Sequence, residues 1–209
     1  MQTKSNQAKV IGLTGNIGCG KSAVAKILAT LGAAVVDADQ VSREVTKTGT
    51  PLLRTLLAEF GPGIIDAETG ELNRQALRGI VFADPKKRRR LESLLHPAIA
   101  KRSRERFEEL FKSGAEVVIY EATLIVEAKR TAEFDGLLVI TADSSTQMRR
   151  LMERDPGLTT QTAHQILSAQ LPQSEKIKAA TWVIENNGSL EELSSKVEQW
   201  WANVRSRSG

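Results

Sequence analysis

Residues 15–22, Gly-Asn-Ile-Gly-Cys-Gly-Lys-Ser, constrain the fold of this chain more than any other segment. They follow a short apolar run at 10–14, typical of a buried strand, and precede an amphipathic pattern at 23–31, typical of a helix. The pattern G-x-x-x-x-G-K-[ST] between a strand and a helix is that of a phosphate-binding loop. Glycines permit positive φ angles, so successive N–H groups converge on phosphate oxygens at the positive end of the helix. The segment predicts a nucleoside triphosphate site.

The other apolar runs extend this strand–helix order along the chain. Short continuous runs predict strands, and the amphipathic stretches between them predict helices: strands at 10–14, 34–36, 117–120, 137–140 and 182–184, and helices at 23–31, 75–81, 86–95, 99–111, 146–153 and 190–201. Strand–helix–strand order implies right-handed crossovers and a parallel sheet. The predicted fold class is therefore α/β, a phosphate-loop kinase fold with a parallel β-sheet flanked by helices.

The uneven spacing of these strands predicts two attachments to the core. About 80 residues separate the second and third strands, which is too many for one crossover helix. We therefore expect a nucleotide-binding core at 9–50, 113–148 and 179–202, a helical substrate-binding insertion at 51–112, and a lid at 149–178. We expect residues 1–8 and 203–209 to be frayed ends.

Composition excludes several classes of protein. With 41% hydrophobic residues among 209, the chain can build a packed core, which excludes intrinsic disorder. A single cysteine allows no internal disulfide, and the polar N-terminus lacks the apolar stretch of a secretory signal. No apolar run approaches the ~20 residues that span a bilayer. We expect a cytoplasmic protein without a membrane partner.

Each position of the loop has an expected task. Lys21 is expected to reach the β- and γ-phosphates, and Ser22 to ligate Mg²⁺. Cys19 is expected to be a small residue tolerated in a tight loop, although the adjacent helix N-terminus would lower its pKa and make it a redox switch. The predicted ATP-binding residues of this segment are Gly15, Asn16, Ile17, Gly18, Cys19, Gly20, Lys21, Ser22 and Ala23.

Asp37 and Asp39 close the second predicted strand. Because alternate strand residues face the same side, both carboxylates are expected to point toward the groove beyond the strand. One carboxylate would hold Mg²⁺ through water, and the other would accept the proton of an attacking hydroxyl. The alternative is a helix N-cap or a turn, where Asp is also favoured.

Three arginines lie on the predicted helix that runs into Asp155-Pro156-Gly157. Arg150 and Arg154 are four residues apart and share a face, whereas Arg149 lies beside them. Guanidinium groups over a triphosphate stabilise the charge of a phosphoryl transition state, and a closing lid excludes water. Together with the phosphate loop, this pattern predicts a small-molecule kinase; a solvated basic face is the alternative.

Residues 86–106 concentrate the positive charge, with nine Lys or Arg and two Glu. A nucleic-acid patch is one interpretation, but aromatic stacking residues are missing. A solvated helix face and a site for an anionic small substrate are the two other interpretations. We expect no nucleic-acid partner.

The ordered motifs of the chain resemble the dephospho-coenzyme A kinase family. The resemblance covers residues 9–195 and rests on GLTGNIGCGKS at 12–22, DAD at 37–39, GELNRQAL at 70–77, VFADP at 81–85, LESLLHPAI at 91–99, LIVE at 124–127, RRLMERD at 149–155, AQLPQSEK at 169–176 and VIENNGSLEEL at 183–193. The phosphate loop alone fits many NTPases, but this series is far more selective.

The resemblance implies ATP-dependent phosphorylation of the ribose 3′-hydroxyl of dephospho-coenzyme A, the last step of coenzyme A synthesis. It implies Asp39 as general base, Asp37 with Ser22 at Mg²⁺, and Arg150, supported by Arg154, on the transferring phosphates. Asn187 and Gly188 resemble the adenine-side loop. Positions near the acceptor substrate are occupied by Arg43, Arg74, His96 and Glu127. For His96, before Pro97, a buried structural histidine is the alternative.

Some positions depart from the family pattern. Glu121 stands where an aspartate is expected, and Thr123 replaces a proline; Asn73, Thr181 and Ala23 are further departures. A longer carboxylate still reaches Mg²⁺ through water, so the local geometry is affected more than the chemistry. The competing hypotheses are another kinase of this core, acting on a nucleotide, a sugar acid or shikimate, and a regulatory NTPase that binds nucleic acid. We expect a monomer or a weak homo-oligomer.

Overall fold

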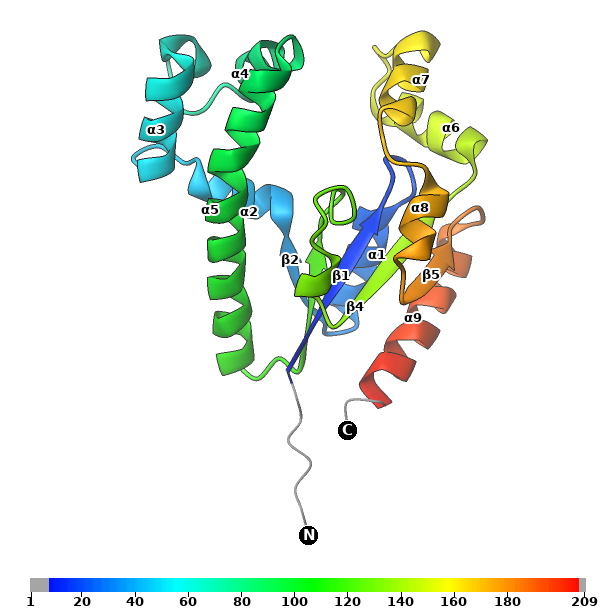
Figure 1. Cartoon of the computed structure of the whole chain (residues 1–209). Coiled ribbons are helices and arrows are strands. Elements are labelled where there is room, and N and C mark those ends of the chain that lie inside the picture. Colours follow the sequence, from blue (N-terminus) through cyan, green and yellow to red (C-terminus); the bar gives the residue numbers. More distant parts are fainter. Residues whose placement is uncertain (1–7, 207–209) are drawn as a thin grey trace. The chain divides into compact units, whose positions relative to one another are not determined.

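The computed structural model describes residues 8–206 and contains a five-stranded sheet of order β2-β3-β1-β4-β5 (Figure 1). Its strands are β1 (Lys9–Gly15), β2 (Ala34–Asp37), β3 (Val117–Glu121), β4 (Gly136–Thr141) and β5 (Trp182–Glu185). β1 pairs in parallel with both β3 and β4, and β4 pairs in parallel with β5. The five predicted strands and the α/β fold class are confirmed.

The chain divides into two compact units, of which the larger comprises the residues up to Val36 and those from Glu109 onward. We call it the core unit. Its helices are α1 (Lys21–Thr30), α6 (Ser144–Arg154), α7 (Thr160–Ser168), α8 (Gln173–Lys178) and α9 (Leu190–Ser206), with a short 3₁₀ turn η2 (Thr131–Glu133). Its apolar cluster joins β1, β3, β4 and β5 to α1 and α9, and includes Leu28, Leu138, Val197 and Trp201. Consecutive residues of β3 and β4 are buried, which means burial on both faces of the sheet and explains why these strands are continuous apolar runs.

The second unit, Asp37–Glu108, is helical, and we call it the helical unit. It contains α2 (Ala38–Val45), α3 (Pro51–Phe60), η1 (Pro62–Ile64), α4 (Arg74–Phe82) and most of α5 (Pro85–Lys112). Thr50 caps α3 by accepting the Leu53 N–H at 3.2 Å, and Asn73 caps α4 in the same way from Ala76 at 2.9 Å. Its small apolar core is built on Leu56, Ile64 and Leu77.

Three expectations about helices are wrong. The segments at 86–95 and 99–111 form one helix, α5, which continues through Pro97. Proline removes one hydrogen bond of the helix, but Leu91, Leu94 and Leu95 pack on the apolar core of the helical unit and hold the first half in place. The helices α2 and α3 lie where no helix is predicted, and α9 extends to Ser206 although fraying is expected from 203. Residues 1–7 and 207–209 lie outside the described part of the chain.

The sheet order determines where a ligand can bind in the core unit. β1 lies between β3 and β4, and the chain crosses to opposite sides of β1 to form them. In open α/β sheets, ligands bind beyond the carboxyl ends of the strands at such a switch point. The segment that leaves the carboxyl end of β1 is the predicted phosphate loop. The residue ranges given above for a core, an insertion and a lid stay predictions.

Candidate functional site

The glycines of the loop at 15–22 are required by its backbone. Gly18 has φ 79°, and a Cβ there would lie 2.7 Å from the carbonyl oxygen of Gln147 on α6. Gly20 has φ 93°, a left-handed conformation, and serves as the N-cap of α1. A side chain at either position would therefore force the loop away from α6 or strain the start of α1.

Hydrogen bonds from distant segments hold four successive loop residues. Asn16 donates its side-chain amide to the Leu171 carbonyl at 3.1 Å, and Ile17 donates its backbone N–H to Gln170 Oε1 at 2.8 Å. The Gly18 carbonyl accepts from Arg150 Nη1 at 3.3 Å, and the Cys19 carbonyl accepts from Asn186 Nδ2 at 2.8 Å. Each partner lies more than 130 residues away along the chain, so the conformation of the loop is set by the segments around it.

Lys21 and Ser22 stand at the start of α1. The Lys21 ammonium donates to the Gly15 carbonyl at 2.8 Å and to the Asn16 carbonyl at 3.3 Å, so it folds back over the loop. Ser22 Oγ donates to Glu121 Oε1, at the end of β3, at 2.9 Å. A hydroxyl beside a carboxylate is an oxygen donor set that suits Mg²⁺, which takes one or two carboxylates together with phosphate oxygens and water. Ser22 and Glu121 therefore fit the predicted Mg²⁺.

Cys19 is fully buried in the loop, and its thiol donates to Gln173 Oε1 at 3.4 Å. Burial raises the pKa of the thiol above its ordinary value, and this effect outweighs the opposing influence of the Asn16 backbone and of Lys21. The expected lowering of the Cys19 pKa by the helix N-terminus is therefore wrong. The thiol acts as a small buried group, as the first of the two interpretations expects.

The arginines of α6 have different surroundings. Arg150 is half-buried against the loop and also donates to the carbonyl of Asn186 at 3.0 Å. Arg154 is exposed at the end of the helix, and Arg149 pairs with Glu153 at 3.0 Å. Of the three, only Arg150 has a described contact with the phosphate loop.

The predicted adenine-side residues follow β5. Asn187 Oδ1 accepts the backbone N–H of Asp143, the N-cap residue of α6, at 2.8 Å. Gly188 is exposed beside it. The loop after β5 is thus tied to the start of α6, the helix that carries Arg150.

The two aspartates do not lie along a strand as expected. β2 ends at Asp37, which is the N-cap of α2, and its Oδ1 accepts the backbone N–H of Asp39 at 2.8 Å. Asp39 lies in the first turn of α2, where its exposed carboxylate is compatible with the positive end of the helix dipole. The prediction that both carboxylates project from one face of a strand is wrong. The N-cap alternative describes Asp37.

A cavity of about 590 Å³ in the helical unit contains two of the predicted acceptor-side residues. We call it the cationic cavity; it is lined by Arg43, Glu44, Thr46, Lys47, Glu71, Leu72 and Arg74. Arg74 Nη2 donates to Thr46 Oγ1 at 2.8 Å. Burial and the nearby charge of Arg43 lower the pKa of Arg74, whereas Asp39 and Glu71 oppose this effect. The structure thus places Arg43, Arg74 and Asp39 within electrostatic reach of one another.

Arginines of α5 strengthen the positive charge of this cavity by pairing with Glu44. Glu44 accepts from Arg102 at 2.9 Å and from Arg106 at 3.0 Å. Burial raises the pKa of Glu44, but these hydrogen bonds outweigh it and the net shift is downward. Because Glu44 is neutralised from outside, Glu71 alone opposes Arg43, Lys47 and Arg74 among the lining residues.

The other predicted acceptor-side residues lie elsewhere. His96 is exposed on α5, so the alternative of a buried structural histidine is wrong. Glu127 lies in the core unit, after β3, and pairs with the fully buried Lys176 at 2.8 Å. Several cations of 86–106 are paired on the surface, for example Arg90 with Glu59 at 3.0 Å.

Comparison with known proteins identifies the family of this chain. A family model for dephospho-CoA kinase matches residues 9–192. A curated dephospho-CoA kinase of Geobacter sulfurreducens is 46% identical over 193 residues, which cover 92% of this chain and 97% of that protein. The chain belongs to the dephospho-CoA kinase family. The resemblance seen in the sequence and the kinase class are thereby confirmed.

Solved structures of similar proteins agree with this family. The crystal structure of TT1252 from Thermus thermophilus has a TM-score of 0.78 and 35% identity, and covers 94% of this chain and 98% of its own. Dephospho-CoA kinase from Campylobacter jejuni has a TM-score of 0.72 over 96% of this chain and 98% of its own, and at 23% identity it supports the fold alone. Among the described residues, no helix of this family member is long and apolar enough to cross a membrane.

Sequence reasoning missed several residues that surround the phosphate loop in this kinase. Asn186 is buried and bonds both to the Cys19 carbonyl and to Arg150. Gln170, Gln173 and Lys176 belong to the motif AQLPQSEK, to which no task was assigned. Their regular spacing of three residues is the signal that could have identified them.

Proposed function

We propose that this chain transfers the γ-phosphoryl group of ATP to the ribose 3′-hydroxyl of dephospho-coenzyme A, giving coenzyme A and ADP. One observation carries the proposal: a phosphate loop at the switch point of the sheet, with Arg150 bonded to its Gly18 carbonyl, in a member of the dephospho-CoA kinase family. Glycine-rich backbone, Lys21 and Arg150 are the groups that a phosphoryl transfer needs, because that reaction depends on positioning and charge stabilisation.

The core unit supplies the phosphate side of the reaction. The N–H groups at the start of α1 bind phosphate oxygens, and Lys21 exchanges its loop carbonyls for the β- and γ-phosphates. Arg150, supported by Arg154, stabilises the charge on the transferring group. Asn187 and Gly188 contact the adenine. The ATP-binding set otherwise comprises the loop residues 15–23.

Ser22 would hold Mg²⁺, with Glu121 beside it and Asp37 contributing through water. Bound there, the ion neutralises charge on the β- and γ-phosphates. The Ser22–Glu121 hydrogen bond of 2.9 Å supports this assignment, because it brings two suitable oxygen atoms together at the end of β1 and β3.

The helical unit supplies the acceptor side. Asp39 accepts the proton of the ribose 3′-hydroxyl as that oxygen attacks the γ-phosphorus. Arg43 and Arg74 bind the diphosphate of the acceptor, and the cationic cavity that they line supports this role. His96 and Glu127 are further acceptor contacts; the exposure of His96 is compatible with that role, whereas Glu127 must bind while paired with Lys176.

A coupled assay of ADP release tests this function. The chain is given ATP with dephospho-coenzyme A, adenosine, AMP or shikimate. We expect turnover with dephospho-coenzyme A far above that with the other three acceptors. Activity on AMP, adenosine or shikimate alone would overturn the proposal. A crystal structure with dephospho-coenzyme A bound should place the ribose 3′-oxygen within hydrogen-bond reach of Asp39.

The remaining expectations stay predictions. They are a cytoplasmic protein, a monomer or weak homo-oligomer, and no nucleic-acid partner. Titration with fluorescent single-stranded and duplex oligonucleotides checks the last of these. Tight, salt-sensitive binding without kinase activity would favour a nucleic-acid-binding NTPase instead.

A further inference from the structure

Residues 170–176, which we call the anchor segment, send three side chains into the core unit at regular intervals. Gln170 bonds to the phosphate loop after β1, Gln173 to the residue after β4, and Lys176 to the loop after β3. These three strands are adjacent in the sheet, with β1 in the middle. One short segment therefore contacts the carboxyl ends of all three strands at the switch point.

Gln170 occupies a donor of the phosphate loop. Its Oε1 accepts the N–H of Ile17 at 2.8 Å, and the neighbouring Leu171 carbonyl accepts the side chain of Asn16 at 3.1 Å. The Ile17 N–H is therefore already bonded to the anchor segment, on what we call the outer side of the loop. The later part of the loop, from Gly18 toward the N-terminus of α1, is left to bind phosphate. Ile17 and Gln170 are 153 residues apart in the sequence, so this hydrogen bond forms only when the core unit has folded.

Gln173 connects the anchor segment to β4 through both halves of its amide. Its Oε1 accepts the Ala142 N–H at 3.1 Å, and its Nε2 donates to the Ala142 carbonyl at 2.9 Å. The same Oε1 accepts the Cys19 thiol at 3.4 Å. Gln147 Nε2 also donates to the Ala142 carbonyl, at 2.7 Å. The backbone group to which Gln173 bonds is therefore itself held in place by α6.

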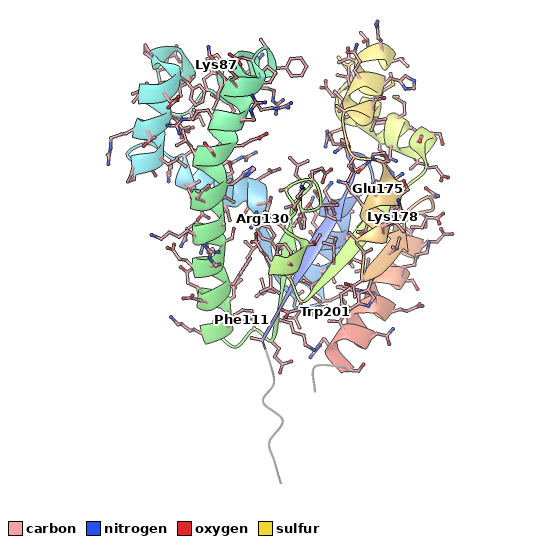
Figure 2. The ribbon with its side chains drawn as sticks, in the orientation of Figure 1. Lys87, Phe111, Arg130, Glu175, Lys178 and Trp201 are labelled. Carbon is pink, nitrogen blue, oxygen red and sulfur yellow. The ribbon has the colours of Figure 1, made fainter. Side chains whose placement is uncertain are left out.

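Lys176 fixes the other end of the segment. On α8, Glu175 and Lys178 lie at the surface and pair with each other (Figure 2). Lys176, on the same helix, has a side chain that is 0% exposed. Its ammonium donates to the Thr123 carbonyl at 2.9 Å and pairs with Glu127 at 2.8 Å. A buried lysine is retained only where its charge is paired and hydrogen-bonded, so this residue cannot move independently of the loop after β3.

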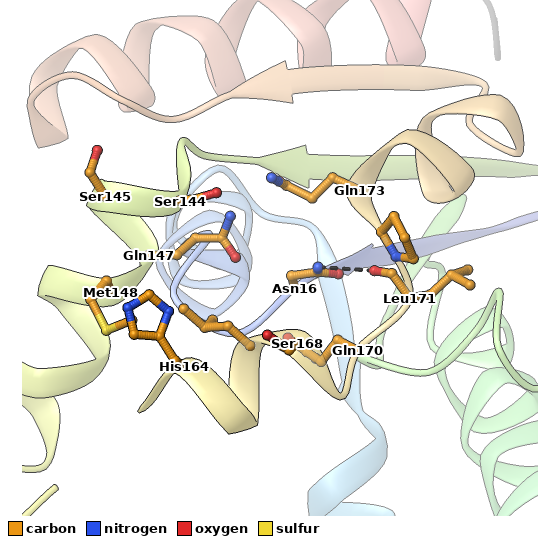
Figure 3. Close-up of a pocket in the computed structure, with 12 residues that line it drawn as sticks. Asn16, Ser144, Ser145, Gln147, Met148, His164, Ser168, Gln170, Leu171 and Gln173 are labelled. Atoms are coloured by element: carbon orange, nitrogen blue, oxygen red, sulfur yellow. Dashed lines mark hydrogen bonds between the residues drawn. The ribbon is translucent and has the colours of Figure 1, made fainter. Parts of the chain in front are cut away.

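The loop is not held here by close packing. A cavity of about 560 Å³ lies between α6, α7 and the anchor segment, and Asn16, Gln147, Gln170 and Gln173 line it (Figure 3). Asn16 Oδ1 is buried without a described partner, and only its amide nitrogen bonds to Leu171. Beside this open space, the hydrogen bonds from the anchor segment restrain residues 16 and 17, together with the bonds that the Asn16 carbonyl accepts from Lys21 at 3.3 Å and from the Cys19 N–H at 3.2 Å.

We propose that Gln170 and Gln173 are positioning residues for ATP binding, which hold the phosphate loop in its phosphate-binding conformation from the outer side. Lys176 keeps the segment that carries them fixed to the core unit. This inference rests on the proposed function only in assuming that ATP binds at the loop. The two glutamines bond to Ile17 and Cys19 of the phosphate loop, so we expect their effect to fall on ATP.

Substitution of Gln170 gives the sharpest test. Gln170→Leu removes the acceptor of the Ile17 N–H while keeping a side chain of similar size, whereas Gln170→Glu keeps an acceptor oxygen. Hydrogen exchange of the Ile17 amide, measured without nucleotide, should become faster in Gln170→Leu and stay slow in Gln170→Glu. The Kd of a fluorescent ATP analogue for Gln170→Leu should rise about tenfold, since one buried hydrogen bond is lost.

Two controls separate positioning from general stability. Gln165 is an exposed glutamine on α7, and Gln165→Leu should leave the Ile17 exchange rate, the nucleotide Kd and the Tm unchanged. The KM for dephospho-coenzyme A and the kcat at saturating ATP should change less than about threefold in Gln170→Leu. Gln173→Leu should raise the nucleotide Kd as well and speed the labelling of Cys19, the single cysteine of the chain.

The inference is overturned if Gln170→Leu leaves the Ile17 exchange rate and the nucleotide Kd within twofold of the unsubstituted chain. It is also overturned if Gln170→Glu fails to keep the amide slow, or if the acceptor KM rises as much as the nucleotide Kd. An unsubstituted chain that binds the nucleotide but does not phosphorylate dephospho-coenzyme A refutes the proposed function and leaves this inference standing.

Discussion

The phosphate loop and the cationic cavity both bind anions in our proposal, yet they are built in opposite ways. In the loop, the Ile17 N–H and the Cys19 carbonyl are held by side chains more than 150 residues away. In the cavity, Arg43 and Lys47 are exposed, and Arg74 is fixed by one hydrogen bond from the same unit. One site is set before its ligand arrives, and the other presents charge on adjustable side chains.

This difference follows from what each site must do. A loop that stabilises a transition state gains most when its dipoles are already aligned, because no free energy is then spent on alignment during the reaction. A cavity that holds a long, flexible acceptor needs net charge more than fixed geometry. We therefore expect substitutions at reacting groups and in the loop to change kcat steeply, and substitutions in the cavity to change KM mildly.

The largest effect is expected at Asp39, the one group of the helical unit that we place at the reacting oxygen. Asp39→Asn removes the proton acceptor and should lower kcat by about 10⁴-fold, with the affinity for ATP unchanged. Steady-state kinetics and an ATP titration measure the two quantities. Asp84→Asn is the control for loss of one carboxylate from the helical unit; Asp84 accepts the Lys86 N–H at the start of α5 at 2.8 Å, and Asn caps equally well. A kcat within tenfold of normal in Asp39→Asn would exclude Asp39 as the base.

Lys21→Ala tests the preset character of the loop. The ammonium that now bonds to the Gly15 and Asn16 carbonyls is lost, together with a principal contact to the transferring phosphate. We expect kcat to fall on the order of 10³-fold. Lys26 is exposed on the same helix, and Lys26→Ala should retain normal kinetics. If Lys21→Ala raised only the KM for ATP, Lys21 would contribute binding and no transition-state stabilisation.

The same contrast explains how much the sequence predicts. The loop is a local pattern, in which glycine spacing and the flanking strand and helix identify the site without any tertiary knowledge. The five strands are likewise identified by their short apolar runs; the central strands are the most buried, and all six residues of β4 are buried. Local signals therefore suffice for the sheet and for the side of the loop that faces phosphate.

The outer side of the loop has no local signal. Gln170 and Asn186 meet the loop only after the sheet has formed, and single glutamines and asparagines are common in loops of any kind. At Asp37 and Asp39, the sequence pattern fits both the end of a strand and the N-cap of a helix. The structure forms the helix α2 there, with Asp37 as its N-cap. At Pro97, the packing of Leu91, Leu94 and Leu95, which precede the proline, on the apolar core of the helical unit overrides its helix-breaking tendency.

A smaller effect is expected in the cationic cavity. Arg74→Ala should raise the KM for dephospho-coenzyme A about tenfold, because a charged hydrogen bond to phosphate is lost from a partly exposed site. The kcat and the KM for ATP should remain within about twofold. Arg78 lies one turn further along α4 and outside the cavity lining, so Arg78→Ala is the matched control. A large fall in kcat in Arg74→Ala would mean that Arg74 has a fixed position that the reaction requires, as the loop residues have.

The smallest effect is expected at Glu44. Its substitution tests whether this side chain acts through its charge or through its packing. The folded pKa of Glu44 is lowered, so its contribution to stability is complete above its ordinary pKa of 4.5 and is lost as the pH falls through the folded value. Glu44→Gln should therefore lower the apparent free energy of unfolding by under about 1 kcal/mol at pH 7, since the side chain is 37% exposed. In urea unfolding, this difference should shrink as the pH falls below 4.5 and through the lowered pKa of folded Glu44.

Glu92→Gln is the control for this last measurement, because Glu92 pairs loosely with Arg88 at 3.9 Å and both side chains are exposed. It should leave stability unchanged across this pH range. Glu44→Gln frees Arg102 and Arg106 and makes the cavity more positive, so the KM for dephospho-coenzyme A should fall slightly while kcat stays constant. A pH-independent loss of stability would show that Glu44 acts through packing. The positive field of the cavity would then come from Arg43, Lys47 and Arg74 without help from α5.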